Sequence, residues 1–387
     1  MRRTSVATML VGSLLLLLGT AVAHAGLKLK DADGNEKIDL GFRLQVLGIS
    51  TDRDLDGDGK FETYDDFRIR RARFRLKGTV NEHFGMFFQT DVSGNDIQMI
   101  DAYIHLKKDA KLQAFLGQHL PPSNRQNVTS SGTLLAADRP NIIYKTLTWG
   151  GRALQAFATG TRGDTDSGLR GTAQVRDTGV TLFGVNDMGS NTHLKYHLGY
   201  YDGISAPGQD SERTTGRIQF NFGDPEPSYY SVATYLGGKD TLAIGASYDT
   251  QSDVGNATFQ ADYTASSFDI FADKPVGEGS LTFEAAFLDL DLDGRAPSVE
   301  GDGFYVQAGY LIRKEKWQPW FLYEEWNSND PTGQGSGDAF RVGVSYFMAG
   351  HNANFKVGYE SLSTDTNIGS SDENGVDTIL VGFYTTY

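Results

Sequence analysis

The residues with the clearest chemical potential form one stretch, 67–78, in which basic and apolar side chains alternate. The basic positions are Arg71, Arg73, Arg75 and Lys77, and the apolar positions between them are Ala72, Phe74 and Leu76. Successive side chains of a β-strand point to opposite faces, so the stretch predicts one cationic face and one apolar face. Guanidinium groups present forked donors that match phosphate or carboxylate oxygens, and the cationic face therefore predicts binding of small anions.

The same stretch changes its alternation between Arg70 and Arg71, because Phe67 and Ile69 are out of register with the later apolar positions. A β-bulge, which adds one residue to one of two paired strands, would restore the pattern. It would turn Arg68 and Arg70 to the same side as Arg71 and the basic residues that follow. We therefore predict a bulge at this point and a longer ladder of basic side chains.

A second interpretation of this ladder is purely structural. Carboxylates also occupy alternating positions in other segments, among them Asp91, Asp101 and Glu284. Buried charges are costly unless they are paired, so these acids could instead hold the arginines as part of a wall. The sequence alone leaves both interpretations open.

A long segment, residues 118–151, interrupts the alternation. It contains Arg125, Arg139 and Lys145 against a single acid, Asp138, so it is locally positive in an acidic chain. A connection of this length inside a compact domain is usually functional. We expect it to fold inward as the third external loop and to bring its basic side chains to a constriction. A solvated surface loop is the alternative.

An acidic run at residues 54–65 has the D-x-D-x-D-G spacing of a calcium-binding loop. Asp54, Asp56 and Asp58 take its first, third and fifth positions, and Asp65 takes the twelfth. Converging carboxylates suit a hard cation that needs oxygen ligands. The twelfth residue is Asp rather than the usual bidentate Glu, and no helices flank the run. Calcium binding and a hydrated acidic loop are therefore both retained as interpretations.

Alternation recurs along the chain and defines the elements that must position these residues. Apolar side chains fill every second position in segments at 40–46, 100–106, 194–200, 304–310 and 340–346. Such segments approach the about 9–11 residues of a tilted transmembrane strand, and the first connections alternate between long and short. We predict an all-β fold, a transmembrane antiparallel β-barrel of about 16 strands, with about 14 or 18 as alternatives. A soluble β-sandwich is the competing class.

The first 25 residues have the form of an export signal. Arg2 and Arg3 precede a short apolar run, and Ala23-His24-Ala25 is an A-x-A cleavage site, so we place one mature domain at 26–387. Without those two arginines, 33 of the 35 basic residues face 49 acidic residues, giving a net charge of −16. This acidity argues against a nucleic-acid partner. The chain has no cysteine, which excludes disulfides and haem attachment through C-x-x-C-H.

Several of these features together resemble the phosphate-selective porin O/P family, best over residues 38–200. They are the run 67–78, Asp101-Ala102-Tyr103, Gly117-Gln118 before a Pro-containing loop, Asp138-Arg139, and Arg176-Asp177-Thr178-Gly179-Val180. The resemblance implies a trimeric barrel of about 16 strands with an inward third loop, in the outer membrane of a Gram-negative bacterium. It implies an anion-path role for Arg71, Arg73 and Arg75 and, by extension, Lys77. Arg68 and Arg70 join this path through the predicted bulge, and Arg125, Arg139 and Lys145 join it by their position in the loop.

These inferences predict an outer-membrane porin, a passive diffusion channel for small hydrophilic solutes that prefers anions such as phosphate. We expect contact with outer-membrane lipid, a homotrimer, no catalytic residues, and no cofactor apart from the calcium considered above. A second hypothesis is the barrel sheath of a porin–cytochrome electron conduit. A hypothesis of another class is an exported calcium-binding adhesin or enzyme, which would fractionate as a soluble protein.

Overall fold

The computed structural model describes residues 27–31, 36–53, 62–93, 97–140, 175–203, 211–256, 259–364 and 376–387. Within these ranges, no helix is long and apolar enough to cross a membrane. The export signal, most of the acidic run and Lys145 lie outside the described residues, so the predictions about them stay predictions.

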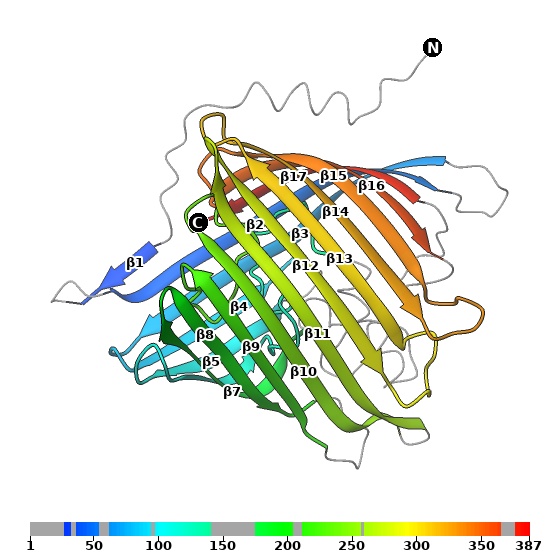
Figure 1. Cartoon of the computed structure of the whole chain (residues 1–387). Coiled ribbons are helices and arrows are strands. Elements are labelled where there is room, and N and C mark those ends of the chain that lie inside the picture. Colours follow the sequence, from blue (N-terminus) through cyan, green and yellow to red (C-terminus); the bar gives the residue numbers. More distant parts are fainter. Residues whose placement is uncertain are drawn as a thin grey trace.

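Seventeen strands make up the described structure, and sixteen of them close into one antiparallel barrel (Figure 1). They are β1 (Leu27–Lys30), β2 (Glu36–Arg53), β3 (Glu62–Thr79), β4 (Phe84–Asp91), β5 (Gln98–Lys107), β6 (Gln113–His119), β7 (Asp177–Gly189), β8 (Thr192–Tyr201), β9 (Arg213–Gly223), β10 (Thr241–Asn256), β11 (Phe259–Val276), β12 (Gly279–Asp291), β13 (Gly301–Leu311), β14 (Trp317–Ser328), β15 (Gly337–Phe347), β16 (Ala353–Thr364) and β17 (Val376–Thr386). From β2 onward each strand pairs with its neighbours in sequence, and β17 pairs back with β2. The short β1 adds only a pairing at the start of β2, so the prediction of a barrel of about 16 strands is confirmed.

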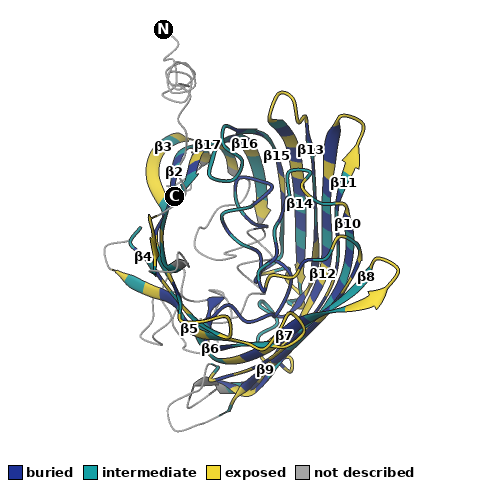
Figure 2. Ribbon diagram, turned by 90° about the vertical axis from the view of Figure 1, so that its left-hand side faces the viewer, coloured by how far each residue is buried: buried dark blue, intermediate teal, exposed yellow. Residues whose placement is uncertain are grey.

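Side chains alternate between the two faces of the wall. In β9, Arg217 and Gln219 are buried in the interior, whereas Ile218, Phe220 and Phe222 are exposed on the outside. Figure 2 shows buried and exposed residues alternating along many of the strands. An apolar outer face around a polar interior is the arrangement of a barrel that has lipid outside and water inside. The competing soluble sandwich, whose polar face would meet solvent, does not fit it.

Two connections were left open by the alternation in the sequence. Residues 257–273 could have formed one strand or two, and the structure places residues 259–276 in the single strand β11. At the other end of the barrel, β9 and β10 are joined by the long connection 224–240, which folds into the interior instead of crossing directly between strands.

The predicted bulge is present in β3. Arg71 and Ile69 lie opposite consecutive residues of β2, so Arg70 is the extra residue. Residues directly opposite one another in antiparallel strands share a face. Arg68 lies opposite Leu47, which is buried on the inner face, whereas Ile69 is exposed on the outer face. The prediction of a bulge between Arg70 and Arg71 is therefore confirmed.

Candidate pore constriction

Residues 120–140, which follow β6, run through the interior of the barrel (Figure 2). On β16, the Lys356 ammonium donates to three consecutive carbonyl oxygens, those of residues 134–136, at 2.5, 3.0 and 2.9 Å. On β17, the Tyr384 hydroxyl donates to the next carbonyl oxygen, that of Ala137, at 2.8 Å. Buried carbonyl groups need partners, so these bonds hold the segment against this side of the wall.

The same segment reaches the opposite side through Arg125. Its guanidinium binds both carboxylate oxygens of Glu226, each at 3.0 Å, and lies 3.8 Å from Glu284 on β12. It also lies 4.0 Å from the ring centroid of Phe271 on β11. Burial alone would raise the pKa of Glu226, but Arg125 outweighs burial and holds that pKa below its ordinary value. Arg125 therefore braces the segment across the lumen rather than facing an open path.

Glu226 belongs to residues 224–240, the long connection between β9 and β10, and this connection meets the inward segment directly. The Ser231 N–H donates to the Val128 carbonyl oxygen over 2.9 Å, and the Ser130 N–H donates to the Ser231 carbonyl oxygen over 3.0 Å. Two chain segments from opposite ends of the barrel are thus joined by main-chain hydrogen bonds inside it.

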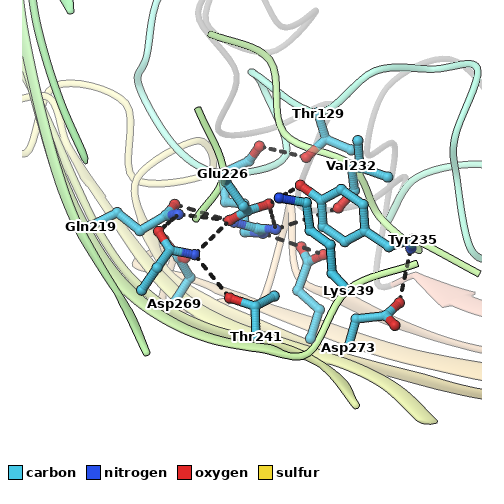
Figure 3. A network of polar contacts seen from close by, with 12 residues as sticks. Thr129, Gln219, Glu226, Val232, Tyr235, Lys239, Thr241, Asp269 and Asp273 are labelled. Carbon is cyan, nitrogen blue, oxygen red and sulfur yellow. Dashed lines mark hydrogen bonds and ion pairs between the residues drawn. The ribbon is translucent and has the colours of Figure 1, made fainter. Parts of the chain in front are cut away.

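Figure 3 shows how this connection is held. The Gln219 amide of the wall and the Tyr235 hydroxyl of the connection each donate to Glu226 over 2.7 Å. Farther along, Tyr229 packs against Phe115 and Phe183, with ring centroids 4.6 and 4.9 Å apart. The sequence analysis did not identify this connection. Its composition resembles that of a surface loop, and its location depends on contacts between distant residues.

Asp138 of the inward segment binds two arginines of the ladder. The Arg70 Nε donates to Asp138 Oδ2 over 2.7 Å, and the Arg71 Nη2 donates to Oδ1 over 3.1 Å. Two consecutive side chains can reach one carboxylate because the bulge brings both to the same side of the strand. Burial alone would raise the pKa of Asp138, but the two arginines outweigh it and hold that pKa well below its usual range.

Ser131 of the inward segment joins two further arginines. Its hydroxyl oxygen accepts from Arg43 Nη1 at 2.9 Å and from Arg73 Nη1 at 3.1 Å. The Arg73 Nε also donates to Asp91 over 2.7 Å, so this arginine has the wall-bracing contact of the structural interpretation. Arg43, on β2, was missing from the predicted site. In the sequence, Arg43 occupies a polar position of an alternating strand. One basic residue at such a position is only a weak indication of a functional site.

The remaining ladder residues are more open to solvent. Arg68 and Lys77 are exposed, and Arg75 is half-buried. Among the described residues, none of these three cations has an ion pair within 4.0 Å. Arg68 lies toward one end of β3 and Lys77 toward the other, so they extend the cationic row beyond Asp138 in both directions. Several sites of similar affinity in a row allow an anion to bind and then move on.

Arg139, another predicted site residue, belongs to the inward segment itself and not to β3. The Arg139 guanidinium donates to two carbonyl oxygens of its own segment, and the Arg139 carbonyl oxygen accepts from Arg341 on β15 over 3.0 Å. Arg139 therefore stabilises the inward segment, as Arg125 does. Lys145 lies outside the described residues, and its role in the anion path stays a prediction.

Of the calcium candidates, only Asp65 falls within the described ranges, and it lies exposed on β3. Asp54, Asp56 and Asp58 lie outside them. In the part of the chain that the structure describes, no group of three His, Asp or Glu side chains is placed to hold a metal ion. Calcium binding by the acidic run stays a prediction.

The charges around the inward segment are unbalanced. Within the described residues, and apart from the pairs Arg176–Asp101 and Arg341 with Glu324 and Glu360, five guanidinium groups gather near two carboxylates, Asp91 and Asp138. The five are those of Arg43, Arg70, Arg71, Arg73 and Arg139. In a narrow lumen with low-dielectric walls, such an excess produces a positive potential that concentrates anions.

Comparison with known proteins agrees with this architecture. An uncharacterized protein of Aquifex aeolicus (strain VF5) is 24% identical over 291 residues, which are 70% of this chain but only 63% of that relative. The anion-selective porin from Comamonas acidovorans superposes with a TM-score of 0.60 at 12% identity, covering 90% of this chain and 99% of the porin. OmpF of Salmonella typhi, in complex with daunomycin, gives 0.56 at 16% identity, covering 93% and 100%. These structural similarities concern the fold.

The family itself is given by a sequence match. Residues 45–382, most of the chain, match the family Phosphate-selective porin O and P. That match agrees with the closed antiparallel barrel, the polar interior and the inward segment described above. The chain belongs to the phosphate-selective porin O and P family and is an outer-membrane protein of a Gram-negative bacterium.

Proposed function

We propose that this porin is an anion-preferring diffusion channel for small hydrophilic solutes, with the inner face of β3 as the anion path. The observation that carries the proposal is the row of Arg68, Arg75 and Lys77, which form no ion pair within 4.0 Å among the described residues, although Asp39 of β2 lies opposite Lys77. Forked and ammonium donors of this kind suit phosphate and other oxyanions as well as chloride. The anion selectivity of the similarly folded Comamonas acidovorans porin supports the proposal.

Single-channel recording in asymmetric KCl tests the sign of the selectivity. We expect a reversal potential of the anion-preferring sign. The double variant Arg75→Gln/Lys77→Gln should lower the anion-to-cation permeability ratio. A unit charge about 7 Å from an ion in water contributes about 0.6 kcal/mol, with opposite signs for an anion and a cation, so each neutralised charge should change the ratio by about 1.2 kcal/mol, roughly sevenfold. Adding phosphate to the chloride bath should reduce the current in the wild type more than in the variant.

The control variant is Lys274→Gln. Lys274 lies on β11 next to the buried Asp273 and forms an ion pair with the exposed Asp240. Its removal changes the net charge by one unit without touching the proposed path, so the permeability ratio should stay at the wild-type value. Cation preference in the wild type, or an equal response to Lys274→Gln, would contradict the proposal.

We also propose that the channel is a homotrimer. OmpT of Vibrio cholerae, solved in a trimer form, has a TM-score of 0.52 to this chain at 15% identity. Native mass spectrometry of the detergent-solubilised protein should give a mass of about three chains, and a monomer under mild conditions would contradict this expectation.

The contacts of the inward segment also bear on the conduit hypothesis. A barrel that threads a protein partner needs an unobstructed interior. Residues 120–140 are bonded to β16 and β17 on one side and, through Arg125 and Gln126, to Glu226 and Glu284 on the other. These contacts favour solute diffusion over a sheath. Co-purification with a cytochrome and the absence of ion conductance would reverse this preference.

A further inference from the structure

Lys195, on β8, is a cation in the barrel interior without a partner. Its residue is 2% exposed, and its Nζ makes no hydrogen bond or ion pair within the described part of the chain. An ammonium group has three donors and no acceptor. Burying such a group without compensation is far more costly than burying a paired charge. A compensating acceptor is therefore expected beside Lys195.

Glu226 is the carboxylate that acts electrostatically on Lys195, and both Glu226 and the Asp269 partner of Arg217 are already engaged. Glu226 binds Arg125 through both of its oxygens. Asp269 binds Arg217 through both oxygens, at 2.5 and 2.9 Å. Arg125 and Arg217 both lie within electrostatic range of Lys195, so they add to the positive potential there instead of relieving it.

His197 lies two residues along the same inner face and is 1% exposed. Within the described part of the chain its ring has no side-chain hydrogen-bond partner, and its hydrogen-bonding contact is with the backbone of Tyr229. Tyr229 of the inward connection covers the imidazole edge-on, with ring centroids 5.0 Å apart. The Tyr229 hydroxyl is already used, because it donates to the Leu120 carbonyl oxygen over 2.6 Å. Lys195 is thus a buried donor on a part of the wall that the connection covers.

We propose that a small inorganic anion, of the size of chloride, resides between Lys195 and His197 and holds residues 224–240 against β8 and β9. The Lys195 ammonium offers only donors, and Arg125 and Arg217 add positive potential around it, so the site selects an anion over a cation. Its burial selects a small ion over an organic acid. The site is distinct from the anion path on β3, several strands away, and does not depend on the selectivity proposed above.

Crystals of the wild-type protein grown in bromide test the site directly. We expect an anomalous bromide peak within hydrogen-bonding distance of Lys195 Nζ and on the His197 side of it. Growth in phosphate without halide distinguishes an oxyanion, which would give tetrahedral density at the same place. Density that shows only water bridging Lys195 to Glu226, with no anomalous peak, would overturn the proposal.

Thermal unfolding of the intact porin provides a second readout. At constant ionic strength, chloride or bromide should raise the transition temperature relative to gluconate, which is too large to enter, because an ion that binds only the folded state stabilises it. Lys195→Met should remove this halide dependence. Lys274→Met, at a half-exposed pair outside the site, should retain it. Equal halide dependence in wild type and Lys195→Met would overturn the proposal even if both variants fold.

Discussion

Replacing Glu226 by Gln should separate the two inward segments while leaving the barrel intact. Glu226 accepts two hydrogen bonds from Arg125, each at 3.0 Å, and one each from Gln219, Asn221 and Tyr235, at 2.7, 3.4 and 2.7 Å. Without that charge, the one remaining carboxylate within 4.0 Å of Arg125 among the described residues is Glu284, at 3.8 Å, and the other contacts of the guanidinium are neutral oxygens of Gln219 and Val232. Breaking a buried ion pair by removing one partner costs about 3–5 kcal/mol.

Amide hydrogen exchange can measure this loss of stability at the contact between the two inward segments. The main-chain bonds of Ser130 and Ser231 join the two segments, so their amides report local opening. A loss of about 3–5 kcal/mol corresponds to roughly a 10²- to 10⁴-fold larger open population. The Ser130 and Ser231 amides of Glu226→Gln should therefore exchange faster by that factor, whereas the amides between β13 and β14 should keep their protection.

The matched control is Glu278→Gln, which makes the same chemical change at an exposed turn between β11 and β12. It should leave the exchange of Ser130 and Ser231 unchanged. Arg125→Met should be more harmful than Glu226→Gln, because it leaves two buried carboxylates without their cation. Unchanged protection of Ser231 in Glu226→Gln would refute the conclusion that this ion pair holds the two segments together.

Three other perturbations have clear expected outcomes. Asp138→Asn removes the carboxylate between the ladder arginines, so the anion-to-cation permeability ratio should rise roughly sevenfold in asymmetric KCl. Because the pKa of Asp138 is depressed, its charge persists below the usual carboxyl pKa and is lost only at lower pH, so wild-type selectivity should not approach that of the variant between pH 7 and about 4.5. Lys356→Met removes three charge-assisted bonds to residues 134–136, and a loss of about 2–3 kcal/mol should speed exchange of the Thr133 amide by roughly 30- to 150-fold. Gly343→Val would place its Cβ against the Trp320 ring, and such overpacking, about 1–3 kcal/mol, should lower the temperature of the heat-induced mobility shift on gels.

Much of the fold could be predicted because a barrel strand has a simple period. Lipid on one side and polar groups on the other impose alternation on every strand, and the strand count follows from counting such segments. The bulge was predictable for the same reason, since an extra residue at Arg70 leaves a visible break in the alternation of Phe67 and Ile69 with Phe74. The alternation and its break depend only on neighbouring residues, so both can be recognised in a single sequence.

The contacts of the site were less predictable because they join residues that are distant in sequence. The partner of Arg125 is Glu226, about a hundred positions away, and no pattern in either segment indicates the other. Arg43 is an isolated basic residue in β2, well separated from Lys37 and Arg53, so parity could place it inward but could not indicate its bond to Ser131. The long connection at 224–240 was missed because its side of the barrel depends on an exact strand count.

The seam between β2 and β17 has a consequence for how the barrel assembles. It joins residues from the two ends of the chain, with Thr386 opposite Arg43, and these are among the most distant pairings in the sequence. Arg43 on one side of the seam binds Ser131, and Tyr384 on the other side binds Ala137. The inward segment therefore bridges the seam from within. We therefore expect closure of the barrel and docking of the inward segment to be coupled. If the barrel closed while residues 120–140 were still outside it, this segment could not reach its partners on β2, β16 and β17.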